Sequence, residues 1–94
     1  MTQRKMVIYR DQVMVEGWPQ QIWAAQKKLT YRRGEKDFPR IPYGKERHDW
    51  KASRIPCHDC KVHEGEFHVP SCDVEECPAC HGQRLSCNCE RDGD

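Results

Sequence analysis

All seven cysteines of this 94-residue chain lie after Pro56, and six of them form pairs separated by one or two residues. A Cys-x2-Cys pair closes a loop too short for an ordinary disulfide, so in a chain without an export signal such pairs are typical of metal ligands. The seventh cysteine stands four positions after a histidine. Zinc prefers four sulfur or nitrogen ligands in closed structural sites. The pattern therefore predicts two zinc ions held by eight ligands: Cys57, Cys60, His68, Cys72, Cys77, Cys80, Cys87 and Cys89.

The eight ligands can be divided between two ions in two ways. A sequential grouping gives the first four ligands to one ion and the last four to the other, which closes loops of seven and six residues. A cross-braced grouping joins Cys57 and Cys60 to Cys77 and Cys80 across the sixteen residues between the pairs, and leaves the other ion to His68, Cys72, Cys87 and Cys89. We favour the sequential grouping because shorter loops cost less closure entropy. A single ion held by the two Cys-x2-Cys pairs is the remaining alternative.

Metal is expected here because the cysteine-rich half has little else to hold it together. Only five large apolar side chains occur in it, at Val62, Phe67, Val69, Val74 and Leu85. A structural zinc contributes its binding free energy to folding, about 10–16 kcal/mol per site. Chelation should therefore unfold this half of the chain.

The half before Pro56 begins with the pattern of a β-hairpin. Two runs rich in β-branched residues, 5–9 and 12–16, flank Arg10-Asp11. Arg-Asp is a poorer tight-turn sequence than Asn-Gly, so the turn is the weakest part of this prediction.

A helix is predicted after the hairpin. Pro19 suits its first turn, and Gly34 is a plausible stop. Helical spacing places four residues on its buried face: Ile22, Trp23, Gln26 and Leu29. The prediction is thus an α+β protein with a hairpin–helix unit at 1–34, an extended basic and aromatic arm at 35–56, and a loop-rich, metal-stabilised zinc-finger module at 57–94.

Charge divides the chain in the same way. Residues 19–56 carry a net charge of +6 and residues 57–94 a net charge of −6, which nearly cancel in the total of +1. Cations interleaved with aromatic rings favour binding of RNA or single-stranded DNA. The predicted contact residues are Lys27, Lys28, Arg32, Arg33, Arg40, Tyr43, Lys45, Arg47 and Trp50. The competing interpretation is that the basic segment neutralises the acidic module of its own chain.

A protein-interaction module or inhibitor is the alternative function. Trp18, Trp23 and Trp50 on so small a body are candidate aromatic anchors for a protein partner. Self-association through the edge of the hairpin, giving a homo-oligomer, is a variant of this hypothesis.

Catalytic motifs are incomplete. The sequence around Cys57 lacks the His-x-Glu of zinc deaminases, and the second histidine of His63-Glu64-Gly65-Glu66-Phe67-His68 comes one position too late for a metalloprotease. A small zinc-finger nuclease is a further alternative, with spare histidines at His48, His58, His63 and His81. We expect a binding protein rather than an enzyme, with no catalytic residue assigned.

The first residues hold charged side chains and no apolar stretch of the kind found in a secretory signal, and no long apolar run occurs anywhere. We therefore expect a cytoplasmic protein with no membrane segment.

The cysteine block resembles small zinc-finger proteins of the zinc-ribbon or zinc-knuckle kind encoded by bacteria, prophages and phages. The resemblance implies zinc and the cytoplasm of a bacterial cell or infected host, and such proteins sometimes act in phage–host conflict. It is carried by about a third of the chain, in Cys57-His58-Asp59-Cys60, Gly65-Glu66-x-His68-x-Pro70, Cys72-Asp73-x-Glu75, Cys77-Pro78-x-Cys80, Gly82-Gln83 and Cys87-x-Cys89.

Overall fold

The computed structural model describes residues 5–89. Five short elements come first: β1 (Met6–Tyr9), β2 (Gln12–Val15), α1 (Trp18–Ala25), β3 (Thr30–Arg33) and β4 (Lys36–Pro39). β1 pairs with β2, and β3 with β4, as two separate antiparallel hairpins. Residues 40–89 follow as loops and turns, with an isolated β-bridge between residues 76 and 83. The predicted α+β class with a loop-rich C-terminal half is confirmed.

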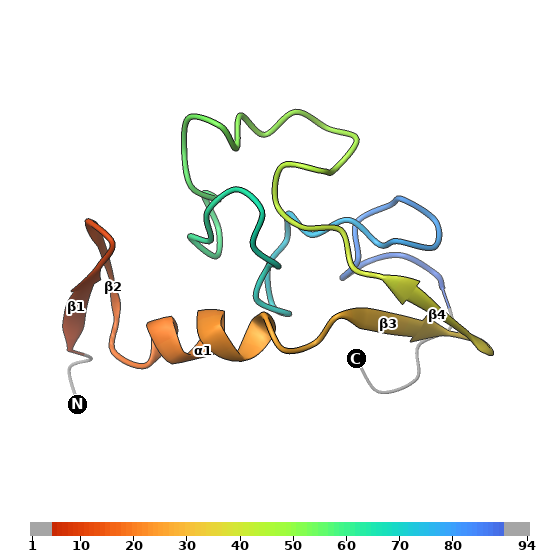
Figure 1. The fold of residues 1–94 in the computed structure, drawn as a ribbon, viewed down its shortest axis with the longest axis horizontal. Coiled ribbons are helices and arrows are strands. Elements are labelled where there is room, and N and C mark those ends of the chain that lie inside the picture. Colours follow the sequence, from red (N-terminus) through yellow and green to blue (C-terminus); the bar gives the residue numbers. More distant parts are fainter. Residues whose placement is uncertain (1–4, 90–94) are drawn as a thin grey trace.

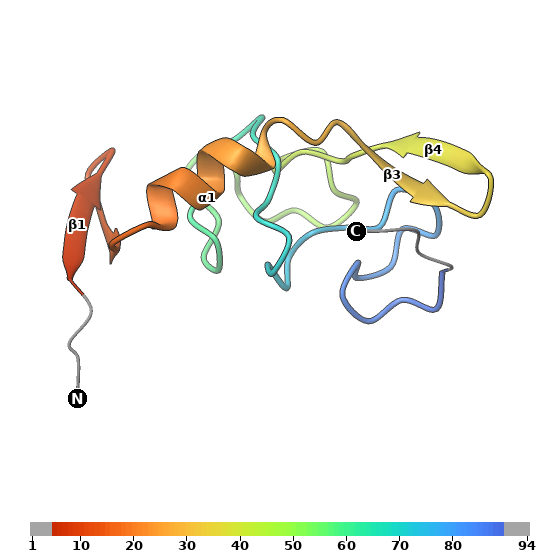
Figure 2. The same cartoon turned by 90° about the horizontal axis from the view of Figure 1, so that it is seen from below.

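The two hairpins lie at opposite ends of the molecule, with α1 between them (Figure 1). Figure 2 shows the same order from a perpendicular direction, with the loops of the C-terminal half running alongside α1 and the β3–β4 hairpin. The helix and the β3–β4 hairpin therefore support the cysteine-rich loops that lie against them.

The β1–β2 hairpin forms as predicted, and its unfavourable turn is held by a long-range contact. Arg10 and Asp11 adopt left-handed φ values of 50° and 64°, as a primed hairpin turn requires. The Arg10 guanidinium donates to both Glu66 carboxylate oxygens at 3.1 and 2.9 Å and lies 4.6 Å from the centre of the Tyr9 ring. These contacts offset the strain of the left-handed backbone at Arg10 and Asp11, which suit this turn less well than Asn-Gly would.

The helix is shorter than predicted and ends at Ala25 instead of near Gly34. Arg40 Nη1 donates to the carbonyls of Ala25 at 2.7 Å and Lys28 at 3.1 Å, which satisfies carbonyls left open at the helix end. Of the predicted buried face, Ile22 is buried and Gln26 half-buried, but Trp23 and Leu29 are exposed.

Residues 30–39, expected to divide between the helix and an extended arm, instead form the β3–β4 hairpin. Gly34 lies in its turn with a left-handed φ of 64°. The run Thr30–Arg33 contains β-branched and aromatic residues, which favour a strand once the helix has ended.

A single hydrophobic cluster joins the N-terminal elements to the cysteine-rich loops. Met14, Ile22 and Tyr43 pack with Val62 and Val69. Three of the predicted ligands, Cys57, Cys60 and Cys72, belong to the same cluster. The first group of cysteines is therefore part of the core on which β2 and α1 rest.

Candidate metal centres and the pocket that links them

Two turns of the same construction position the Cys-x2-Cys pairs. In the first, Lys61 N donates to the Cys57 carbonyl and Cys57 N to the Val62 carbonyl, both at 2.9 Å. The second repeats both bonds at 2.8 Å, from His81 to Cys77 and from Cys77 to the carbonyl five residues later. Lys61 and His81 both adopt a left-handed backbone, with φ values of 68° and 64°. Each turn therefore directs two cysteine side chains to one point.

The first centre consists of Cys57, Cys60, His68 and Cys72, all buried, with ligand atoms within 4.8 Å of one another. The Sγ atoms of Cys57 and Cys72 are 3.6 Å apart, and His68 Nδ1 lies 3.4 Å from Cys60 Sγ and 3.5 Å from Cys72 Sγ. A tetrahedral zinc site has edges of about 3.8 Å between sulfurs and about 3.6 Å between sulfur and nitrogen. The four ligand atoms thus fit a zinc ion.

The second centre consists of four cysteines and lies nearer the surface. Cys77 is buried, Cys80 exposed, and Cys87 and Cys89 half-buried, with sulfurs within 4.8 Å of one another. The Cys77 and Cys89 sulfurs are 3.9 Å apart, close to the edge of a zinc–thiolate tetrahedron and far beyond a disulfide bond. Gly82 N donates to Cys80 Sγ at 3.4 Å, as backbone amides do around ligating thiolates.

The two groups are those of the sequential grouping. Among residues 5–89, the cross-braced set and the single four-cysteine set do not come together as metal-binding groups. All seven cysteines have free thiols in this structure.

The surroundings favour the thiolate, the form that binds metal, at Cys57 and Cys77, whereas hydrogen bonds with Cys57 and Cys60 raise the pKa of Cys72, and hydrogen bonding with Cys80 raises that of Cys89. Hydrogen bonds from Cys60 and Cys72 hold the pKa of Cys57 well below its usual value. Burial raises the pKa of Cys77, but bonds from the backbone amides of Cys80 and Ala79 outweigh it and lower that pKa to about 6.

Glu46 orients the histidine ligand and was not predicted. Its carboxylate accepts a hydrogen bond from His68 Nε2 at 2.5 Å, with both side chains almost fully buried. This bond fixes the imidazole so that Nδ1 faces the cysteines, an arrangement common in zinc sites. Burial lowers the pKa of His68, but hydrogen bonds with Cys57, Cys60 and Glu46 outweigh it and raise that pKa to about 11.

A buried charge network centred on Glu75 ties the β3–β4 hairpin to the segment between the centres. Arg40 Nη2 lies 2.8 Å from Glu75 Oε2, and neither side chain is exposed. Arg84 Nε lies 3.0 Å from the other oxygen, and the Tyr31 hydroxyl donates to both at 2.9 Å. Burial, together with the negative charge of Glu75, raises the pKa of Tyr31. The same Arg40 guanidinium also donates to the His68 carbonyl, beside the first centre.

The predicted nucleic-acid residues divide into accessible and buried ones. Lys27, Arg32, Lys45 and Arg47 are exposed, and Lys28 and Trp50 are half-buried. Arg33, Arg40 and Tyr43 are buried. Arg40 is committed to Glu75, and the Tyr43 hydroxyl donates to the carbonyls of Trp50 and Ile55 at 3.2 and 3.1 Å. All three are therefore buried parts of the fold, and Arg40, paired with Glu75, agrees with the alternative that the basic segment neutralises acidic residues of its own chain.

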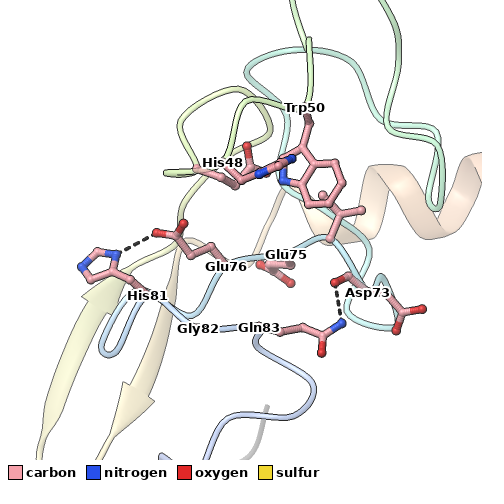
Figure 3. Close-up of a pocket in the computed structure, with 10 residues that line it drawn as sticks. His48, Trp50, Asp73, Glu75, Glu76, His81, Gly82 and Gln83 are labelled. Atoms are coloured by element: carbon pink, nitrogen blue, oxygen red, sulfur yellow. Dashed lines mark hydrogen bonds and ion pairs between the residues drawn. The ribbon is translucent and has the colours of Figure 1, made fainter.

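A pocket of about 250 Å³, here called the linking pocket, lies beside residues 73–76, which connect the two centres. Figure 3 shows His48 and Trp50 on one side of it and residues 73–83 on the other. Asp73 is exposed, whereas Glu76 is buried and accepts from His81 Nδ1 at 2.7 Å and from the Arg47 amide at 2.8 Å. Sequence reasoning missed this pocket because its walls come from distant loops.

The spare histidines lie outside both centres. His48 and His58 flank the Trp50 ring, with centroid distances of 4.2 and 5.4 Å. His81 is bound to Glu76, and His63 is half-buried. No group of three or more potential ligands among residues 5–89 includes any of these four.

No helix among the described residues is long and apolar enough to cross a membrane. Comparison of the chain with protein-family models, with curated proteins and with solved structures gives no match.

Proposed function

We propose that this chain is a zinc-stabilised binding protein in which two closed structural zinc sites hold a protein-interaction surface in place. The observation that carries the proposal is the pair of four-ligand groups, whose ligand-atom separations fit zinc tetrahedra. A catalytic zinc keeps one position open, whereas each of these groups supplies four protein ligands. The zinc ions would therefore support the fold and leave recognition to the surrounding side chains.

Elemental analysis of the purified full chain tests the metal part of this proposal. We expect two zinc ions per chain, and exhaustive chelation under reducing conditions should abolish the near-UV circular dichroism signal. Iron in the four-cysteine centre, or an unchanged spectrum after metal removal, would contradict it.

The linking pocket is the recognition site that the geometry supports best. Asp73 and Glu76 line it, and the thiolate centres on both sides give it a negative potential once zinc is bound, because three thiolates in the first centre and four in the second outweigh the double positive charge of each ion. The Trp50 ring borders the same space. Arginine is both a stacking group and a carboxylate partner, so we propose that a basic side chain of a protein partner enters here.

Nuclear magnetic resonance of the zinc-loaded protein tests this site. N-acetyl-arginine-N-methylamide should shift the Trp50 indole Nε1–H signal, and the neutral citrulline analogue should not. Asp73→Asn should weaken the response about threefold to fivefold, the value of one partly exposed ion pair, whereas Asp11→Asn at the far hairpin should leave it unchanged. An equal response to citrulline, or no response at either variant, would refute a cationic ligand.

Nucleic-acid binding is a second candidate, favoured by the six predicted contact residues that remain wholly or partly accessible. If it is correct, a fluorescent single-stranded oligonucleotide should bind with an affinity that falls steeply as salt rises, with a logarithmic slope of about −0.7 per phosphate contacted. Lys45→Glu should reduce that affinity and leave arginine binding in the linking pocket intact. Binding that does not change with salt would exclude this candidate.

A further inference from the structure

The two metal centres differ in how well the protein shields their sulfurs. All four ligands of the first centre are buried, and its three cysteines belong to the hydrophobic cluster of the core. In the second centre Cys77 is buried, but Cys80 is exposed, and Cys87 and Cys89 are half-buried. A small molecule in solution can therefore reach a sulfur of the second centre, whereas the sulfurs of the first centre are covered.

The segment that carries the second centre has little besides metal ligation to hold it in place. Within residues 77–89 only Cys77 and Arg84 are buried, and Leu85, the one large aliphatic side chain, is 37% exposed. This segment lies at the β3–β4 end of the molecule, where it is drawn in blue (Figures 1 and 2). Loss of the metal there should loosen this segment and leave the core intact, because local stability follows the local density of buried contacts.

The sulfurs of the second centre are close enough to pair with one another. All four lie within 4.8 Å of one another, and the Cys80 thiol forms a hydrogen bond with that of Cys89. Cys77 and Cys80 are too near in sequence for an ordinary disulfide, whereas eight residues separate Cys80 from Cys89. Cys89 is therefore the partner that an oxidised Cys80 should take.

We propose that Cys80 is a site of oxidation by hydroperoxides, and that a Cys80–Cys89 disulfide replaces the metal ion of the second centre. The Cys80 thiolate attacks one peroxide oxygen, so that an S–O bond forms, the O–O bond breaks, and hydroxide leaves and is protonated to water. The Cys89 thiolate then attacks the oxidised sulfur, which forms the S–S bond, breaks the S–O bond and releases a second hydroxide, also protonated to water. One peroxide is thus reduced as two thiolates are oxidised, and the two thiolates left are too few for a closed zinc site.

Oxidation at this centre should also affect the linking pocket. Cys77 N donates to the Gly82 carbonyl and His81 N to the Cys77 carbonyl, both at 2.8 Å, so the turn is built around a ligand. His81, Gly82 and Gln83 line the pocket on the side opposite Trp50 (Figure 3). Loosening the turn should open that side. The effect on ligand binding rests on the function proposed for the pocket, whereas oxidation and metal release do not.

Hydrogen peroxide added to the zinc-loaded full chain tests the proposal, with released zinc followed by a chromophoric chelator. One of the two zinc ions should be released, and mass spectrometry should find a Cys80–Cys89 disulfide while the cysteines of the first centre stay reduced. Amide resonances of residues 77–89 should lose their dispersion, and those of core residues such as Ile22 and Val62 should keep it. The same protein without peroxide controls for zinc that the chelator removes by itself.

Cys80→His tests the assigned sulfur, because histidine can ligate zinc but cannot form a disulfide. The variant should retain two zinc ions and release the second about tenfold more slowly in peroxide. If it does not retain that ion, Cys89→His takes its place, and it should leave Cys80 as a sulfenic acid that a 1,3-dione reagent labels. Release of both ions at one rate, or oxidation of the first centre before Cys80, would overturn the proposal. Zinc content unchanged in excess peroxide, or a zinc-loaded Cys80→His protein as sensitive as the original, would do the same.

Discussion

Arg40 should be one of the most costly side chains in the protein to remove. It is fully buried. Its guanidinium pairs with the Glu75 carboxylate and also donates hydrogen bonds to the carbonyls of Ala25, Lys28 and His68. Arg40→Met keeps much of the apolar stem but leaves a buried carboxylate short of one cation and three carbonyls without their donor. Breaking a buried ion pair by removing one partner costs about 3–5 kcal/mol. That is a large part of the roughly 5–15 kcal/mol by which a small domain is stable.

Urea denaturation at fixed free zinc, followed by circular dichroism, measures this loss. Arg40→Lys should recover only part of it, because an ammonium cannot reproduce the fork of contacts. Arg32→Met is the control, since Arg32 is exposed and lies 3.6 Å from an equally exposed Asp37, and its removal should cost less than about 0.5 kcal/mol. If Arg40→Met cost less than about 1 kcal/mol, the network would not hold the helix end, the hairpin and the first centre together as described.

Three other substitutions test separate parts of the account. Glu46→Gln should weaken zinc affinity at the first centre about 10-fold to 100-fold in a chelator competition, because His68 loses a charged acceptor; no change would refute its orienting role. Lys61→Gly should raise the free energy of unfolding by about 0.5–1 kcal/mol, since glycine accepts the left-handed φ of 68° without strain. Burial raises the pKa of Glu66, but hydrogen bonds from Arg10 and from the His63 amide outweigh it and lower that pKa below its usual value. Arg10→Met should therefore cost up to about 1 kcal/mol at pH 7, and the difference from the unmodified protein should vanish as pH falls through the lowered pKa of Glu66.

The metal centres were the part of the structure most open to prediction from sequence. Cys-x2-Cys spacing is a local signal, and the short loops between ligands favoured the sequential grouping that the structure adopts. The β1–β2 hairpin was also predictable, because the pattern that indicates it lies within a short stretch of the sequence. The weak turn at Arg10 and Asp11 forms because of Glu66, which lies more than fifty residues later in the chain.

Long-range contacts account for what the sequence did not reveal. The helix ends at Ala25, where Arg40 donates to the Ala25 carbonyl and to that of Lys28 beyond the helix, and helical periodicity alone contains no sign of these contacts. Arg40 and Tyr43 were predicted to contact nucleic acid because cations alternate with rings in this segment, but both are buried, Arg40 against Glu75 and the Tyr43 hydroxyl against backbone carbonyls. The linking pocket was not predicted, because the loops around Trp50 and Asp73 that line it are distant in the sequence.

Cadmium-113 magnetic resonance of the cadmium-substituted protein tests the central claim most directly, because the chemical shift of each bound ion reports its number of sulfur ligands. We expect two resonances, one from a centre with three sulfurs and one nitrogen and one from a centre with four sulfurs. Cys87→Ser should move or abolish the four-sulfur resonance and leave the other unchanged. A single resonance, or an effect of Cys87→Ser on the resonance of the centre that contains His68, would contradict two sequential centres.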